Sequence, residues 1–288
     1  MKKTFLLVAF VFALSLSACV SNGAQSSSNN SKPYINSKPY IIDPTKEQIT
    51  YGLYPQKNVS DASLILELDK ITTPESNGWY LYNNEYYAKT EGRPYSGGTI
   101  GVFDNGTRIQ NGKMYWFKCE PIVWNIVKSE NNRYYLISSV ILDVHQYSSS
   151  SGNYINSEIR SWLNDNFYHS AFMDGETYVA TIAVDNSAST TDSETNPYIC
   201  ENSNDKVFLQ SYQDYSQITE ENRLCLSTEW ARTKGVQGKS NFSSSYWTRS
   251  PDSNQNLGAF IVNFDGGLDG CHVVNTSIGV RPSICLLA

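Results

Sequence analysis

Charged residues are scarce in this 288-residue chain, and no cluster of Lys and Arg is present. Asp, Glu, Lys and Arg together make up 17% of the residues, and the net charge is −6. Lys2 and Lys3 are the only charged residues among the first 18, so the remainder carries −6 − 2 = −8. Nucleic-acid phosphates demand clustered basic side chains, so we expect no nucleic-acid partner.

Histidine patterns that bind metals are also absent. The three histidines are His145, His169 and His272, and no HxxxH or HExxH sequence places two of them on one face of a helix. Cys271 and His272 are neighbours on an expected strand, so their side chains would point to opposite faces. We therefore expect neither a metal site nor a cofactor.

Cysteine pairs of the CxxC type are missing, which argues against a zinc knuckle and a thioredoxin-like redox site. Two interpretations of the five cysteines beyond residue 19 stay open. Outside the cytosol they could form one or two disulfides and leave at least one thiol free, or all five could be small buried apolar side chains. The five are Cys119, Cys200, Cys225, Cys271 and Cys285.

The chain lacks the GxSxG elbow of serine hydrolases. Ser250 and Asp252 lie close in sequence and His272 could approach them, but serine is so abundant that such a trio arises by chance. We expect no enzymatic activity, and a hydrolase that acts on cell-envelope glycans is a minor alternative.

The N-terminus has the pattern of an export signal. Lys2 and Lys3 precede an apolar run at residues 5–14, which is too short for a bilayer-spanning helix. The following Leu16-Ser17-Ala18-Cys19 resembles the lipobox of bacterial lipoprotein signal peptides. That resemblance implies a signal peptide at residues 1–18 and acylation of Cys19, since two or more acyl chains anchor a protein firmly. We expect a lipid-anchored, extracytoplasmic protein on a bacterial cell membrane or outer-membrane surface; an ordinary signal peptide with an incidental cysteine is the alternative.

Residues 19–47 are expected to form a flexible tether. The stretch "SNGAQSSSNN" cannot bury enough apolar surface to become ordered. A duplicated hexapeptide follows, at residues 30–35 and 36–41, and we interpret it as spacer sequence. Residues 48–288 are expected to form a single folded domain.

The folded part alternates many short strand patterns with few helices, which is typical of an α+β fold. Helices are predicted at residues 63–71, from Asn156 or Ser157 to Phe167, and at residues 228–235. Hairpin turns are predicted at Asn83-Asn84, at residues 130–132 and at residues 265–267. Strands are predicted at 49–56, 113–129, 133–142, 181–184, 206–211, 246–250, 258–264, 268–274 and 279–287.

Six motifs in this order resemble those of an uncharacterised bacterial domain family found in secreted proteins and lipoproteins. They are "WFKCEPIVWNIV", "ILDV", "IRSWLNDNF", "DKVFLQS", "YWTRSP" and "GVRPSI". The family is similar to the C-type-lectin-like superfold, which implies that the first and last strands, "YGLYPQ" and "GVRPSICLL", pair and that long loops bind ligands. Glu120-Pro121-Ile122 lacks the asparagine of the EPN motif, so calcium-dependent lectin activity is not implied.

Three residues of these motifs are expected to support the scaffold. Trp162 lies on the apolar stripe of the second predicted helix, so we expect it to be buried. Arg249 and Arg281 follow strand residues, where a planar guanidinium can donate to several backbone carbonyls.

The polar loops near the C-terminus are the predicted ligand-binding surface, for an extracellular protein or glycan. The abundance of Tyr, Ser and Asn is typical of adaptable binding surfaces, although it is also compatible with a purely structural envelope lipoprotein. Residues 245–280 further resemble the variable segment of proteins diversified by retroelements, and an ordinary fixed binding face is the alternative. Residues 75–110, rich in tyrosine, are the next place to look for a site. The predicted ligand-binding residues are Asp252, Asn254, Gln255, Asn256, Asp265, Asp269, His272 and Asn275.

Overall fold

The computed structural model describes residues 38–173 and 176–288. The predicted signal peptide, Cys19 and residues 19–37 of the predicted tether lie outside the described residues. The rest of the predicted tether differs from the expectation, because strand β1 (Ile41–Asp43) already belongs to a sheet. Tyr40, just before it, is buried, makes edge-to-face contacts with the rings of Tyr51 and Tyr178, and donates its hydroxyl proton to the Leu287 carbonyl at 3.0 Å. This aromatic packing orders a segment that composition alone marked as flexible.

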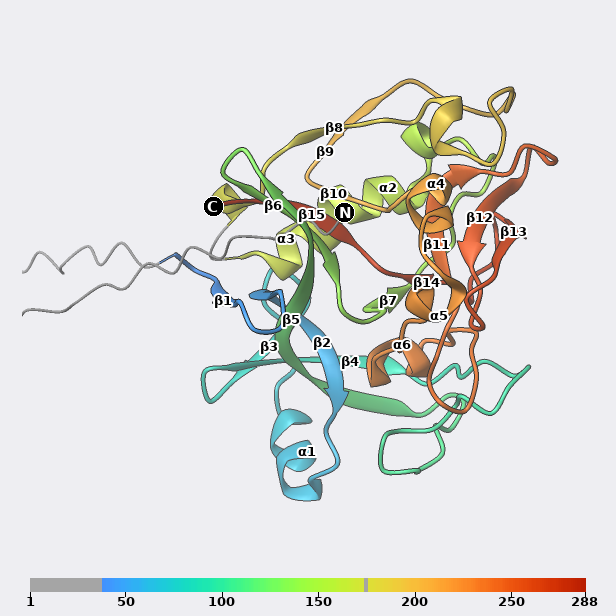
Figure 1. The fold of residues 1–288 in the computed structure, drawn as a ribbon. Coiled ribbons are helices and arrows are strands. Elements are labelled where there is room, and N and C mark those ends of the chain that lie inside the picture. Colours follow the sequence, from blue (N-terminus) through green and yellow to red (C-terminus); the bar gives the residue numbers. More distant parts are fainter. Residues whose placement is uncertain (1–37, 174–175) are drawn as a thin grey trace, which may run out of the picture. The chain divides into compact units, whose positions relative to one another are not determined.

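An antiparallel sheet of eight strands forms one half of the fold (Figure 1). Its main order is β1-β2-β5-β6-β15-β10, and the β3–β4 hairpin adds to β5. The predicted turn Asn83-Asn84 is confirmed. The turn predicted at residues 130–132 consists of Asn131-Asn132, because Glu130 still belongs to β5, and all four asparagines have positive φ, as type I′ hairpin turns require. The strands are β2 (Gln48–Asn58), β3 (Tyr80–Tyr82), β4 (Glu85–Glu91), β5 (Met114–Glu130), β6 (Arg133–Ser138), β10 (Val207–Phe208) and β15 (Ser283–Leu287), besides β1.

A second sheet has five strands in the order β13-β12-β11-β14-β7. Its neighbours are antiparallel except β11 and β14, which are parallel. A separate pair is formed by β8 (Ile182–Val184) and β9 (Ser203–Asp205). The strands of the second sheet are β7 (Asp143–Val144), β11 (Tyr246–Pro251), β12 (Gly258–Val262), β13 (Leu268–His272) and β14 (Gly279–Val280).

The C-terminal segment "GVRPSICLL" was predicted as one strand paired with the first strand, and both expectations are wrong. Arg281 and Pro282 divide the segment, so that β14 lies in the five-stranded sheet and β15 in the eight-stranded sheet. Pro282 has no backbone N–H to continue a ladder. β15 pairs with β6 and β10, whereas β2 pairs with β1 and β5.

Helices are few and short, so the described residues form a mixed α+β fold with mostly antiparallel sheets. Ser157 caps α2, since its hydroxyl accepts from the Arg160 backbone N–H, and Gly235 follows α6 with φ of 98°. Within residues 38–173 and 176–288, no helix has the length and apolar character needed to cross a membrane. The helices are α1 (Ala62–Leu68), η1 (Tyr154–Asn156), α2 (Glu158–Trp162), η2 (Leu163–Phe167), α3 (Tyr168–Ala171), η3 (Glu176–Tyr178), η4 (Ala188–Thr190), α4 (Tyr212–Ser216), α5 (Glu220–Arg223) and α6 (Glu229–Thr233).

The largest apolar core joins residues of both sheets and of the α2–α3 segment. Trp124 of β5 and Trp247 of β11 are fully buried in it. Trp162 differs from the prediction, because it is only half-buried at the edge of this core. Its ring stacks on His145 at 5.1 Å and contacts Phe167 at 5.6 Å, while Ile159, Leu163 and Phe167 form the buried stripe.

Candidate functional site

The loop that connects β11 to β12 is organised by Asp252. This residue is buried, and its carboxylate accepts hydrogen bonds from the Asn254 N–H (2.9 Å), Asn254 Nδ2 (3.1 Å) and Gln255 Nε2 (2.7 Å). Aspartate commonly bonds the backbone two residues ahead in this way. The sequence predicted Asp252 as a ligand-binding residue, whereas its carboxylate is turned into the loop and holds the loop's conformation.

The backbone of this loop is fixed, while four of its side chains are exposed. Asp252 N–H donates to the Gly258 carbonyl at 3.1 Å, and Gly258 N–H donates to the Gln255 carbonyl at 3.0 Å. The Asn256 carbonyl accepts from Gly152 N–H at 2.9 Å, which ties the loop to a neighbouring segment. The exposed side chains are Asn254, Gln255, Asn256 and Leu257.

β13 supports the loop from one side. A Cβ placed on Gly270 would lie 2.2 Å from Asp252 Oδ2, so the loop fits only because position 270 has no side chain. His272 is exposed at this end of β13, and the Asn275 N–H donates to its carbonyl at 2.9 Å. Asn275 itself is half-buried, since its amide donates to Cys271 Sγ and accepts from Ser277 N–H. The structure thus brings His272 to the same end of the sheet as the exposed loop amides.

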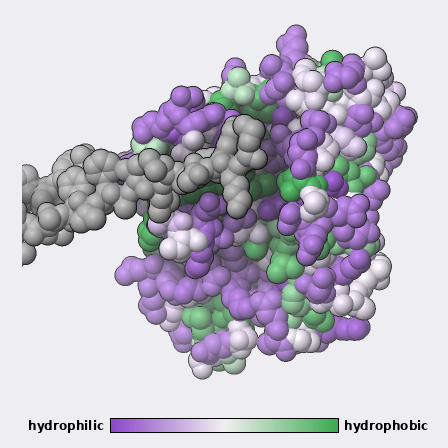
Figure 2. All heavy atoms as spheres, in the orientation of Figure 1, coloured by the Kyte–Doolittle hydropathy of each residue, from purple (hydrophilic) through white to green (hydrophobic). Residues whose placement is uncertain are grey.

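Asp265 and Asp269 lie at the other end of the β12–β13 hairpin. Both are exposed; Asp265 accepts from Gly267 N–H at 3.2 Å, and Asp269 accepts from Asn263 Nδ2 at 2.8 Å. The length of β13, four steps of about 3.3 Å, separates the turn from the His272 end by ~13 Å. The predicted ligand-binding residues therefore form two groups, at opposite ends of the β12–β13 hairpin, and not a single cluster. In the view of Figure 2, hydrophilic side chains cover most of the described surface and hydrophobic ones form small separate areas.

Arg249 and Arg281 are buried beneath this surface, each about 8% exposed. Arg249 donates from Nε and Nη2 to the Asp185 carbonyl, both at 3.1 Å, and from Nη1 to the Leu209 carbonyl at 2.9 Å. Arg281 donates from Nε to the Ser138 carbonyl at 3.0 Å. Both guanidinium groups thus bond backbone carbonyls of other segments, a geometry that positions the scaffold and leaves no face toward a ligand.

Ser250, Asp252 and His272 do not assemble into a catalytic trio. The Ser250 hydroxyl donates to the Thr190 carbonyl at 2.8 Å and accepts from Tyr212 N–H at 2.9 Å, and the residue is about 1% exposed. His272 is exposed on β13, and the Asp252 carboxylate is engaged by the loop. A nucleophile needs a base within hydrogen-bond reach, and here the serine proton goes to a backbone carbonyl.

Cysteine thiols and other side chains able to bind metal ions are scattered across residues 38–173 and 176–288. No group of three or more His, Cys, Asp and Glu side chains is placed to hold a metal ion there, and the five cysteines are unpaired thiols. Cys119, Cys225 and Cys285 are buried, whereas Cys200 and Cys271 are half-buried. Burial raises the pKa of the Cys200 and Cys271 thiols above the ordinary value, which disfavours the reactive thiolate.

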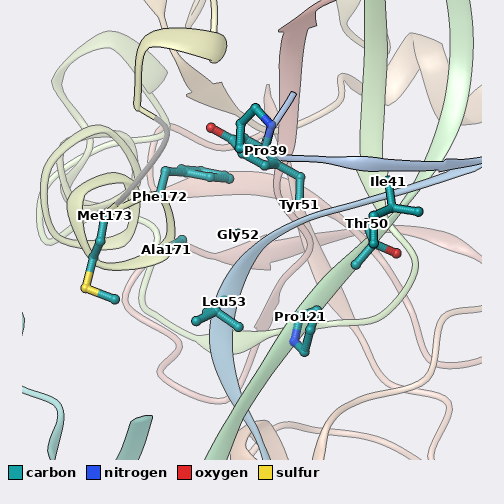
Figure 3. A pocket seen from close by; sticks show the side chains of 10 residues that line it. All are labelled: Pro39, Ile41, Thr50, Tyr51, Gly52, Leu53, Pro121, Ala171, Phe172 and Met173. Atoms are coloured by element: carbon teal, nitrogen blue, oxygen red, sulfur yellow. The ribbon is translucent and has the colours of Figure 1, made fainter. Parts of the chain in front are cut away.

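An apolar hollow of about 280 Å³ lies beside β2 (Figure 3). Gly52 forms its floor with φ of 74°, and a Cβ there would lie 2.7 Å from the Ala171 carbonyl oxygen. Leu53, Pro121 and Phe172 project around it, and Met173 lies at its rim. Its lining carries few polar groups that could orient a ligand, so the hollow by itself indicates no chemistry.

A larger groove of about 710 Å³ lies between β4, α6 and the residues after β7, and sequence reasoning missed it. Lys89, Arg93, Lys234 and His145 line it. Lys234 Nζ lies 2.5 Å from an oxygen of buried Asp143, which fixes the ammonium group. No linear pattern indicates this groove, because its basic residues come from three distant segments. Only the lone carboxylate in "ILDV", the Asp143 position, could have indicated a buried polar contact in this region.

Asp143 connects this groove to the core. Its carboxylate accepts from the Tyr54 hydroxyl at 2.5 Å and from the Val144 N–H at 2.6 Å. Burial, together with the nearby Asp143 charge, raises the pKa of Tyr54 well above its ordinary value. Tyr54 therefore stays protonated and donates to the carboxylate throughout the physiological range.

Comparison with known proteins shows a match to a family defined by sequence. The matching segment, residues 131–288, contains β6 to β15 and thus the whole five-stranded sheet, both arginines and the β11–β12 loop. No curated protein and no solved structure is significantly similar to the chain. Since the match covers more than half of the sequence, the chain belongs to the family described as domain of unknown function (DUF6273).

Proposed function

We propose that this chain is a lipid-anchored, extracytoplasmic recognition module that binds an extracellular protein or glycan. The binding surface would be formed by Asn254, Gln255 and Asn256 together with His272. One observation carries the proposal: buried Asp252 fixes the loop through the Asn254 N–H and the Gln255 amide, while Asn254, Gln255 and Asn256 stay exposed to solvent. A surface that is already ordered loses little conformational entropy when it binds.

A more specific fold than mixed α+β is part of the same proposal. We infer a C-type-lectin-like fold from the six sequence motifs and the order in which they occur. The family match and the mixed α+β architecture support this inference. The absence of β2–β15 pairing departs from that superfold in one respect. A direct test is an experimental structure, in which a different connection of the two sheets would contradict the assignment.

Residues 245–280 are further proposed to be a segment diversified by a retroelement. The exposure of Asn254 and Asn256 supports this proposal, because both residues can change without affecting the core. Asn263 is different: its amide accepts from Ser245 Oγ at 2.9 Å and donates to Asp269. Variation should therefore concentrate at 254 and 256 and spare 263. A reverse-transcriptase gene beside a near-copy of this segment is the genomic observation to seek.

The membrane anchor is proposed at Cys19, with membrane lipid as its partner. Cys19→Ala should release the protein from membranes or stop its processing, since the acyl chains supply the attachment. Phase partitioning in detergent after metabolic labelling with a fatty acid measures this. Unchanged partitioning of the variant would contradict lipidation.

Ligand binding is tested by replacing Asn254, Gln255 and Asn256 together with alanine. A glycan array and a pull-down of envelope proteins first identify a ligand with the wild-type chain. The triple variant should then bind at least about tenfold more weakly, the equivalent of one lost hydrogen bond. Its free energy of unfolding should fall by only about 1 kcal/mol, because Asp252 loses the amide donors of Asn254 and Gln255.

A matched control uses the basic groove. Lys89→Ala and Arg93→Ala change exposed side chains on another surface and should leave this binding intact. Loss of binding in the groove variants with normal binding by the triple variant would move the site to the groove. A chain that binds neither glycans nor proteins would instead favour a structural envelope lipoprotein.

A further inference from the structure

β13 is an outermost strand of the five-stranded sheet, with β12 on one side and no strand on the other (Figure 1). The register with β12 runs from Gly258 opposite His272 to Val262 opposite Leu268 without a shift. Beyond the two ends of this ladder, Val273 N–H donates to the Leu257 carbonyl at 2.9 Å and Asn263 N–H donates to the Gly267 carbonyl at 2.7 Å. These two bonds fix which residues of β13 face β12.

Hydrogen-bonded and non-hydrogen-bonded pairs alternate in an antiparallel ladder. Because Gly267 and Val273 direct their backbone groups to β12, Asp269 and Cys271 do the same. The N–H groups of Leu268, Gly270 and His272 therefore point away from the sheet, as do the carbonyls of Leu268 and Gly270. The His272 carbonyl is already used by Asn275 N–H.

This edge lacks most of the features that usually protect an exposed strand. Proteins block such edges with lysine, proline, bulges or a covering segment. β13 has none of the first three, and Asp269, Gly270 and His272 are exposed. Gly270 offers no side chain that could shield the backbone groups beside it.

Side chains at the two ends of the edge differ in chemistry. Asp265 and Asp269 are exposed at the turn end. Gly266 packs there against the backbone of Glu220, the first of two acidic residues that begin α5. At the other end Leu257 is 39% exposed and Val274 is 45% exposed. An extended segment along β13 would therefore meet negative charge at one end and apolar surface at the other.

We propose that the β13 edge binds an extended peptide segment by strand addition, with a basic residue near Asp269 and an apolar residue near Leu257 and Val274. Main-chain hydrogen bonds to residues 268, 270 and 272 supply the affinity in this mode, and side chains supply the selectivity. This inference rests on the proposed recognition function and names its ligand class. Charge favours a basic peptide over a second copy of the chain, whose net charge is −6.

The probes are labelled octapeptides that alternate threonine and valine and carry two lysines at either the N- or the C-terminal end. Fluorescence anisotropy measures their binding to the folded chain. The same peptides with alternate backbone nitrogens methylated cannot donate along one edge, and peptides with glutamate in place of lysine test the charge. Of the two unmodified lysine peptides, we expect only the one whose lysines lie beside Asp269 to bind. Its methylated form and its glutamate form should each bind at least about tenfold more weakly.

His272→Pro and His272→Ala form a matched pair of variants. Proline removes the outward N–H without breaking a bond to β12, whereas alanine keeps it, and prolines are tolerated on edge strands. We expect about tenfold weaker peptide binding by His272→Pro than by His272→Ala, with equal thermal stability. If His272→Pro folds poorly, strand addition is still tested by comparing how methylated and unmodified peptides bind to the wild-type chain. Asp269→Lys should weaken binding more than Asp269→Asn.

Equal binding of methylated and unmodified peptides would overturn strand addition. So would concentration-dependent self-association that His272→Pro abolishes, because the edge would then pair with a second copy. If loop variants at 254–256 abolish binding of an array ligand while no peptide binds, this inference fails and the proposed function stands. If the chain binds no array ligand, envelope protein or peptide, both fail.

Discussion

Arg281 Nη1 donates a hydrogen bond to the hydroxyl of Tyr246 at 3.1 Å, and its guanidinium carbon lies 5.3 Å from the centre of that ring. Tyr246 begins β11 in the five-stranded sheet. Through Nε, the same guanidinium bonds the carbonyl of Ser138, which ends β6 in the eight-stranded sheet. One side chain thus joins both sheets at the place where the C-terminal segment crosses between them.

Arg281→Ala should lower the free energy of unfolding by about 3 kcal/mol, because it leaves a buried carbonyl and a buried hydroxyl without this partner. Urea denaturation measures the change. Arg93→Ala is the matched control, since Arg93 has a side chain 72% exposed and should change stability by less than about 0.5 kcal/mol. Equal effects of the two substitutions would contradict the sheet-joining role.

Trp162→Ala should cost less than Trp247→Ala. A fully buried tryptophan replaced by alanine typically costs about 3–5 kcal/mol, and Trp247 is fully buried with Nε1 donating to the His145 carbonyl at 2.8 Å. Trp162 keeps part of its ring in solvent, so we expect about half of that cost. Urea midpoints of the two variants provide the comparison, and an equal or larger loss for Trp162→Ala would show that its stacking on His145 matters more than burial.

Stability should fall at alkaline pH. Burial raises the pKa of Tyr246 to about 12 from its ordinary value of 10.0, although the Arg281 charge opposes the shift. Unfolded Tyr246 ionises near pH 10 while the folded residue does not, so its stabilising contribution is complete below pH 10 and is lost as the pH rises toward 12. Each such tyrosine lowers the free energy of unfolding by up to about 1.4 kcal/mol per pH unit in this window.

Tyr246→Phe removes that ionisation. The variant should show a shallower pH dependence between pH 10 and 12 in chemical denaturation, even though it is less stable at neutral pH because the hydroxyl bonds the Arg223 carbonyl. Some dependence will remain, since burial also raises the pKa of Tyr54, Tyr147 and Tyr215. An unchanged slope would mean that Tyr246 is solvated in the folded protein.

Gly270→Ala should displace the β11–β12 loop without unfolding the domain. The added methyl would meet Asp252 Oδ2, and this carboxylate must then give up its bonds to Asn254 and Gln255. Asp252→Ala should displace the loop in the same way and lower the free energy of unfolding by about 1 kcal/mol. Amide hydrogen exchange at residues 253–256 should accelerate in both variants and stay at the wild-type rate in His272→Ala.

Local features of the fold could be predicted from the sequence because their causes lie within a few residues. The paired asparagines at 83–84 and 131–132 adopt left-handed backbone conformations, and Ser157 caps the helix that follows it. Position-specific turn and cap chemistry acts over short distances, so neither feature depends on where the rest of the chain lies. The exposed amide side chains of the β11–β12 loop could be predicted in the same way, from the polar sequence of the loop itself.

Other features depend on packing that no local pattern contains. The division at Arg281 and Pro282 follows from two sheets competing for one apolar run, and periodicity cannot assign its halves to different sheets. Asp252 looked like a surface carboxylate, but Gly270, eighteen positions later, makes the space in which it is buried. The groove with Lys89, Arg93 and Lys234 forms only when three segments meet.

The crossing of residues 279–287 between the sheets has a consequence for biosynthesis. β14 lies between β11 and β7, and β15 lies between β6 and β10, so inner positions of both sheets are filled by residues that the ribosome adds after all other strands. Until then β6 and β11 each lack a neighbour and expose an open edge. Neither sheet can therefore be completed before residues 279–287 are available, so the earlier strands must wait in an unfinished state for a segment that follows them in the chain.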